Sequence, residues 1–262
     1  MFFLLVKVGS ESVYADFQSG LDAANRGDFA TALQEWKPLA EKGHRIAQYN
    51  LGVMYQNGHG VPHNEKQALK WIGLAAEQGF GQAQYDMGLA YYGGIGGVKQ
   101  DYKEAMKWFL MAAEQRVVEA QFSVGVLYEK VDGFPRNHKE AIKWYQLAAE
   151  GGHAGAQYNL GQKYRKGEGV PQNDKIAVMW YQLAARQGMA SAQTVLGSMY
   201  SKGDGVVQDY VKAYMWMSIA ALQEFEPAFK LIKIIEESMS SSQIEEAQKI
   251  ARECVKKGLK GC

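Results

Sequence analysis

The sequence predicts an all-α protein, built as a solenoid of antiparallel helix pairs. The dipeptide Ala-Gln opens five successive repeats of 36 or 37 residues, and each repeat carries nearly the same apolar skeleton. A Gly-rich loop divides each repeat into two helical halves, so every repeat buries its apolar surface against its neighbours. The opening alanines are Ala47, Ala83, Ala120, Ala156 and Ala192.

This period sets the boundaries that the sequence predicts. Residues 1–15 precede the solenoid, residues 16–46 form a shortened repeat, and residues 228–262 form a C-terminal cap of helices. One elongated domain is expected, because self-similar repeats stack in a single line. The five complete repeats span residues 47–82, 83–119, 120–155, 156–191 and 192–227.

Residues 1–15 are predicted to be a signal peptide or the remnant of one. An apolar run from Phe2 to Val6 precedes Val13-Tyr14-Ala15, whose spacing suits cleavage before Asp16. Lys7 interrupts the run and no charged residue precedes it, so a frayed cytosolic N-terminus is the alternative. No other segment approaches the ~20 apolar residues of a membrane span.

The shortened repeat of residues 16–46 follows at once. Phe17, Leu21 and Ala24 share one face of a helix, and Gly27-Asp28 makes a turn. A second helix then carries Ala32, which lies 36 residues before its counterpart in the first complete repeat.

The first helix of each complete repeat supplies the candidate binding surface. Counted from the opening alanine as 0, positions 0, 4, 5 and 8 form an apolar arc, and positions 2, 3, 6 and 9 lie opposite. We expect the latter to line a concave face, here called the first-helix face, and to bind a peptide; the aromatic side chains among them could instead pack between successive first helices. The candidate residues are Tyr49, Asn50, Gln56, Tyr85, Asp86, Tyr92, Phe122, Ser123, Glu129, Tyr158, Asn159 and Arg165.

The second helix of each repeat is expected to begin after an Asn or Asp that caps its N-terminus: Asn64, Asp101, Asn137, Asn173 and Asp209. Each second helix carries one tryptophan at a fixed place, which predicts a core role; a carbohydrate platform is the alternative. These are Trp71, Trp108, Trp144, Trp180 and Trp216.

The C-terminal cap contains both cysteines, Cys254 and Cys262. On one continuous helix their Cα atoms would lie ~12 Å apart, beyond the ~7 Å limit for a disulfide. Gly258 and Gly261 suit a helix stop between them. A disulfide that clips the last helix is therefore predicted, with two free thiols or a two-cysteine metal site as alternatives.

Composition and motifs argue against several classes of function. Lys and Arg total 29 against 28 Asp and Glu, and this net charge of +1 gives no field that would attract nucleic acid. His59 and His63 flank Gly60 and Pro62, which exclude the regular helix that would align two metal ligands. No catalytic, cofactor or metal site is predicted.

The repeats share a frame of glycine, aromatic and small residues at fixed positions. In the first complete repeat these are Gly52, Tyr55, Gly58, Gly60, Val61, Ala68, Trp71, Ala75, Ala76 and Gly79. This frame resembles the Sel-one-like repeat (SLR) family of the tetratricopeptide superfamily, and the resemblance covers residues 16–227. Arg116 and Glu224 depart from the frame, where the terminal Gly of the second helix is expected.

The resemblance implies a right-handed superhelix that acts as a non-enzymatic adaptor of the bacterial envelope, either periplasmic or secreted. Its implied partner is a protein or peptide, in some cases associated with the cell wall. Some cysteine-rich relatives carry a β-lactamase label, so a penicillin-binding or β-lactamase-like enzyme is one alternative. A cytosolic assembly factor is the other.

Overall fold

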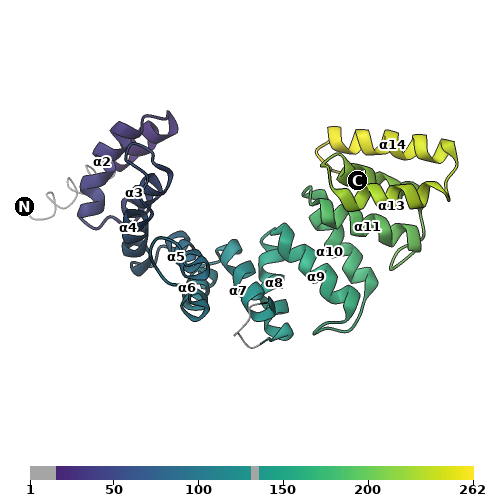
Figure 1. Cartoon of the computed structure of the whole chain (residues 1–262), viewed down its shortest axis with the longest axis horizontal. Helices are drawn as coiled ribbons and strands as arrows, with labels where there is room; N and C mark the ends of the chain where they lie inside the picture. Colours follow the sequence, from purple (N-terminus) through teal and green to yellow (C-terminus); the bar gives the residue numbers. More distant parts are fainter. Residues whose placement is uncertain (1–15, 131–135) are drawn as a thin grey trace, which may run out of the picture. The chain divides into compact units, whose positions relative to one another are not determined.

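The computed structural model describes residues 16–130 and 136–262, where all regular secondary structure is helical (Figure 1). The predicted signal peptide, residues 1–15, lies outside this part of the chain. In the described ranges no helix is both long and apolar enough to cross a membrane. The all-α prediction is confirmed.

Each repeat forms two helices. In every complete repeat the first helix begins two residues before the opening alanine. The first helices are α3 (Arg45–Asn57), α5 (Gly81–Gly93), α7 (Val118–Lys130), α9 (Ala154–Lys166) and α11 (Ala190–Lys202). The second helices are α4 (Glu65–Glu77), α6 (Tyr102–Glu114), α8 (His138–Glu150), α10 (Asp174–Arg186) and α12 (Tyr210–Ala221).

Further helices flank the complete repeats. Residues 16–25 are helical and precede α2 (Phe29–Glu41), while α13 (Glu226–Glu236) and α14 (Ser241–Lys256) follow α12. The chain divides into two compact halves, residues 1–127 and residues 128–262. Helices that are consecutive in the chain pack side by side from α2 to α6 and from α8 to α13, whereas α14 packs against α12.

The predicted caps of the second helices are confirmed. The side-chain oxygens of all five predicted residues accept hydrogen bonds from backbone N–H groups in the first turn that follows. The first helices α3, α5, α9 and α11 end at a glycine in the left-handed conformation, which stops the helix at little steric cost.

A glycine at position 5 lets the two helices of a repeat approach closely. A Cβ atom on Gly52 would lie 2.6 Å from the Ile72 side chain, and one on Gly161 would lie 2.7 Å from the Tyr181 ring. The first helix therefore tolerates no side chain where it crosses the second.

The tryptophans of the second helices are less buried than predicted. Trp216 is buried, whereas the other four are only half-buried. The fully enclosed position is the next residue along the chain, because that side chain points at the close crossing with the first helix. Its occupants are Ile72, Phe109, Tyr145, Tyr181 and Met217.

The glutamine of each Ala-Gln dipeptide joins one repeat to the one before it. Gln84 is buried; its Nε2 donates to the carbonyl oxygen of Ala76 at 3.2 Å, and its Oε1 accepts from Gln115 Nε2 at 2.7 Å. The same pair of bonds recurs at other repeats, and we call it the glutamine joint. It is formed at Gln48 with Ala40 and Gln78, at Gln157 with Ala149 and Gln187, and at Gln193 with Ala185 and Gln223.

The turn after a second helix requires a left-handed residue. Gly79 and Gly188 occupy this place with φ of +79° and +88°. Arg116 and Glu224, the two departures from the repeat frame, adopt φ of 63° and 58° there without a glycine. The backbone path is thus kept although the favoured residue is missing.

The C-terminal helix ends between the two cysteines, as predicted. Ser240 and Gln243 form a capping box at the start of α14, and the helix ends at Lys256. The chain then turns back, which brings the Cα atoms of Cys254 and Cys262 to 5.8 Å, and the structure joins their sulfurs. Arg186 donates to the backbone oxygen of Cys262 at 2.9 Å, which holds this end against α10.

Candidate partner-binding site

The tyrosines at position 2 contact the next repeat. Tyr49 lies edge-on to Phe80, with ring centroids 5.0 Å apart, and its hydroxyl bonds the carboxylate of Asp86. Burial, followed by the charge of Asp86, raises the pKa of the Tyr49 hydroxyl. Burial also raises the pKa of Asp86, although hydrogen bonds from Tyr49 and Gln82 oppose that shift.

A similar link recurs one repeat later. Tyr85 hydrogen-bonds Ser123, and its ring lies 5.7 Å from that of Phe109. Positions 2 and 3 are therefore half-buried ties between successive first helices as well as part of the surface. This packing is the alternative that the sequence left open for the aromatic residues.

In the N-terminal half, an apolar pocket lies between α5 and α7. It has a volume of about 190 Å³ and contains Tyr92 from position 9, with Leu89 from position 6 beside it. Phe109 of α6 forms one wall. Phe122, Ser123 and Val126 of α7 complete the lining.

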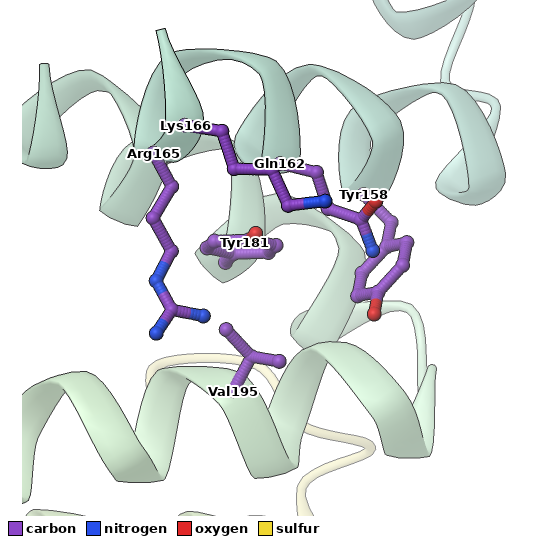
Figure 2. Close-up of a pocket in the computed structure, with 6 residues that line it drawn as sticks. All are labelled: Tyr158, Gln162, Arg165, Lys166, Tyr181 and Val195. Atoms are coloured by element: carbon purple, nitrogen blue, oxygen red, sulfur yellow. The ribbon is translucent and has the colours of Figure 1, made fainter. Parts of the chain in front are cut away.

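In the C-terminal half, a basic pocket occupies the corresponding place between α9 and α11. Its volume is about 320 Å³, and it is lined by Tyr158, Gln162, Arg165, Lys166, Tyr181 and Val195 (Figure 2). Arg165 and Lys166 extend on either side of the Tyr181 ring, as Figure 2 shows. The rings of Tyr158 and Tyr181 meet edge to face at 5.6 Å.

Arg165 donates a hydrogen bond to the Tyr181 hydroxyl. Burial is the main reason why the pKa of Tyr181 is raised, and the positive charge of Arg165 opposes the shift. The Tyr181 hydroxyl therefore stays protonated at neutral pH, and the pocket presents hydrogen-bond donors.

Glu129, predicted to lie on the first-helix face, takes part in a buried polar cluster instead of a pocket. Its carboxylate pairs with Lys163 Nζ at 2.5 Å and accepts from the Tyr145 hydroxyl at 2.6 Å. Lys163 is only 2% exposed and also pairs with Glu168 at 2.8 Å. Asn159 hydrogen-bonds the Tyr145 hydroxyl, so two predicted face residues meet in this cluster.

The polar cluster around Lys163 contains the kinds of side chain that bind metal ions, but it does not form a metal site. Ligand atoms of Glu129, His138 and Glu168 lie within 4.8 Å of one another. The Lys163 ammonium, however, bonds both carboxylates and lies 3.4 Å from His138 Nδ1. A metal ion would have to displace this internal cation, so the residues present do not fit one.

A closer comparison of the repeats could have identified Lys163. Position 7 is apolar in every other complete repeat, where it is Met54, Ala90, Leu127 or Met199. A lysine at a core position signals a buried ion pair, since an isolated buried charge is too costly.

Two histidines have roles that the sequence did not reveal. His44 and His153 each cap the N-terminus of a first helix. Their Nδ1 atoms accept hydrogen bonds from the backbone N–H groups of Ala47 and Ala156, both at 3.1 Å.

The remaining predicted face residues lie outside these pockets. Gln56 is exposed near the end of α3, and Asn50 is half-buried one turn and a half earlier. The structure thus gathers the predicted positions into local sites between neighbouring helices rather than into one uniform surface.

Comparison with known families accounts for this repeated architecture. The model of the Sel1 repeat matches five consecutive segments: residues 45–80, 81–117, 118–153, 154–189 and 190–225. The chain belongs to the Sel1 repeat family. The resemblance that the sequence motifs indicated is confirmed, and proteins of this family generally act as protein-interaction scaffolds.

Solved structures of Sel1 repeat proteins share the fold. A Sel1 repeat protein from Oxalobacter formigenes is 32% identical, with a TM-score of 0.76 over 91% of this chain and 99% of that one. The protein c5321, a protective antigen present in uropathogenic Escherichia coli strains, is 27% identical, with a TM-score of 0.63 over 94% of this chain and 62% of that one. The predicted solenoid class is therefore confirmed.

Curated relatives match over shorter stretches. An F-box protein of Arabidopsis thaliana is 35% identical over 83 residues, which are 32% of this chain and 23% of the relative. An exopolysaccharide production negative regulator of Rhizobium meliloti is 33% identical over 75 residues, which are 29% of this chain and 28% of the relative. Each match thus covers under a third of the relative, so the similarity is limited to the repeat segments.

Proposed function

We propose that this Sel1 repeat protein is a non-enzymatic scaffold that binds a protein or peptide on its first-helix face. One observation carries the proposal. At corresponding places in both halves, positions 6 and 9 of one first helix and positions 2 or 3 of a later one border a pocket. Side chains at these positions differ between the two pockets, whereas the skeleton that supports them repeats, as expected for a recognition surface.

The extended form of the partner follows from the spacing of these features. Each pocket is local to a pair of neighbouring first helices, and aromatic side chains line both pockets. In the N-terminal half, a peptide that lies across α3, α5 and α7 could place one side chain in the apolar pocket and bond Asn50 or Gln56 with its backbone.

Site-specific photo-crosslinking tests the binding face. A photoreactive phenylalanine analogue would replace Gln56 or Gln162 on first helices, with Lys66 and Lys175, exposed on second helices, as controls. We expect adducts with one defined partner in the native host from the first-helix positions alone. Equal adducts from the control positions would contradict the proposed face.

The proposal includes export to the bacterial envelope. Its support is the small-residue pattern before Asp16 together with the pairing of Cys254 and Cys262, since disulfides persist in oxidising compartments. The intact mass of the native protein should correspond to a chain that starts at Asp16, with both thiols blocked until reduction. A retained Met1 and freely alkylated thiols would favour the cytosolic assembly factor.

A further inference from the structure

The basic pocket has chemistry that its counterpart in the N-terminal half lacks. Arg165 and Lys166 take the places of Tyr92 and Gly93, and Gln162 takes the place of Leu89. A core tyrosine, Tyr181, stands where the apolar pocket has Phe109. Every change adds a hydrogen-bond donor, and two of them add a positive charge.

One cation of this pocket, Arg165, forms no ion pair with a carboxylate in the part of the chain that the structure describes. Among the described residues, no carboxylate lies within 4.0 Å of the Arg165 guanidinium, whose bond to the Tyr181 hydroxyl is to a neutral group. Asp174 acts on Tyr181 more weakly than Arg165 does. The positive charge of Arg165 is therefore not neutralised locally.

The nearest acid to Lys166 is held by another residue. Glu168 lies 3.7 Å from Lys166 but 2.8 Å from the buried Lys163, which is the main cause of its lowered pKa. Glu168 therefore pairs more closely with Lys163 than with Lys166, and the Lys166 ammonium is accessible to an anion of the partner.

The walls of the pocket suit a flat anionic group. A guanidinium in a half-buried setting makes stronger hydrogen bonds to a carboxylate than one in open water. The rings of Tyr158 and Tyr181 and the methyl groups of Val195 exclude water from one side. A carboxylate is also the anion that a polypeptide carries without modification.

We infer that this pocket binds a carboxylate of the partner polypeptide through Arg165 and Lys166. The inference rests on the proposed scaffold function and names the group that the C-terminal half recognises. The carboxylate comes either from an Asp or Glu side chain or from the C-terminus of the partner, and the experiment separates these sources.

The probe is a library of random N-acetylated dodecapeptides, prepared with free and with amidated C-termini and selected against the full chain. We expect the bound peptides to be enriched in Asp or Glu. If the source is a side chain, amidation leaves binding unchanged; if it is the C-terminus, amidation abolishes it. Replacing the selected carboxylate by an amide should weaken binding about tenfold.

Variants of Arg165 then test whether the weaker binding of the amide peptide arises in this pocket. Arg165→Gln should weaken the acidic peptide about tenfold and its amide analogue hardly at all, because the two changes remove the same interaction. Arg165→Glu should favour peptides with Lys at that place. Lys175→Gln removes the same charge from an exposed site on α10 and should leave binding unchanged.

Two failures are distinguishable. Peptides that bind without an acidic preference, or that bind Arg165→Gln as well as the native chain, overturn this inference and leave the scaffold function intact. The absence of any selected peptide, with all variants folded by circular dichroism, overturns both.

Discussion

Arg116 and Glu224 hold a backbone conformation that normally belongs to glycine. Arg116 and Glu224 are both exposed and adopt positive φ at the turn after a second helix. At Gly79, the counterpart of Arg116, a Cβ atom would meet nothing within 4 Å. The cost at Arg116 is thus conformational, not a clash with neighbours.

Arg116→Gly should therefore stabilise the protein. The gain expected is about 0.5–1 kcal/mol, since relief of the left-handed strain exceeds the entropy that glycine adds to the unfolded chain. Urea unfolding of the variant measures it, and Glu224→Gly should behave alike. Gly79→Arg is the matched reverse change and should lower the unfolding free energy; a gain from that change would contradict the argument.

His44 makes the stability of α3 depend on pH. Burial, followed by the charge of Arg45, lowers the pKa of its imidazole below the ordinary 6.5, and the cap needs the unprotonated Nδ1. Because the unfolded state binds the proton more readily, the cap stabilises above pH ~6.5 and is lost as the pH falls through the folded pKa.

His44→Asn tests this dependence with a cap that does not titrate. Between pH 8 and pH 5 the native protein should lose up to about 1 kcal/mol more stability than the variant, the typical contribution of an N-cap. Thermal unfolding across this range measures the difference. Since the other histidines are present in both proteins, parallel pH profiles would show that His44 has no such role.

At the scale of helices, the buried cluster around Lys163 ties the C-terminal end of α7 to α8 and α9. Lys163 bonds Glu129 of α7 and Glu168 beyond α9, while Tyr145 of α8 donates to Glu129. The other repeats reach the same packing with an apolar side chain at position 7. Position 7 is therefore filled in one of two ways, by an apolar side chain or by a lysine paired with carboxylates.

Lys163→Met, which installs the residue of the first and fifth repeats, should cost about 3 kcal/mol because Glu129 keeps a buried charge without its cation. The triple variant Lys163→Met, Glu129→Gln and Glu168→Gln should recover most of this loss. Chemical denaturation of the single and triple variants measures both values. A triple variant as unstable as the single one would show that the ion pairs themselves are needed.

The sequence period could predict where each helix lies along the chain. The Asn and Asp caps and the position-5 glycines act within one repeat, so their signals recur five times along the chain. Of the five tryptophans predicted to lie in the core, Trp216 is buried and the other four are half-buried, because a helical period fixes a face and leaves the depth of each side chain to the neighbouring helix.

At the scale of the whole chain, the C-terminal pairing of Cys254 and Cys262 closes the last helix of the solenoid. Breaking it should lower the unfolding free energy by about 2–3 kcal/mol, the loop-closure value for a short loop. Thermal unfolding with and without reductant measures the change. Cys254→Ser with Cys262→Ser should unfold at the same temperature in both conditions, and a native protein indifferent to reductant would contradict the prediction.

The candidate site was only partly predictable from the whole sequence. Positions 2, 3, 6 and 9 were correctly placed on neighbouring first helices, and Tyr158 and Arg165 do meet in one pocket. The sequence could not show that Tyr181 of a second helix would join them, nor that Lys163 would draw Glu129 away. Tyr181 joins them through a contact between the two helices of one repeat, whereas Lys163 bonds Glu129 of the preceding repeat. Neither contact is encoded in the pattern of a single helix.

The glutamine joint attaches each repeat to its neighbour through residues other than those proposed to recognise the partner. Position 1 and the end of the second helix hold a repeat to its neighbour, while positions 6 and 9 border the pockets. A mutation at position 6 that changes the lining of a pocket therefore leaves the glutamine joint to the neighbouring repeat in place. Such a chain can evolve new specificity one repeat at a time, because the contacts that stack the repeats are kept while the lining of one pocket changes.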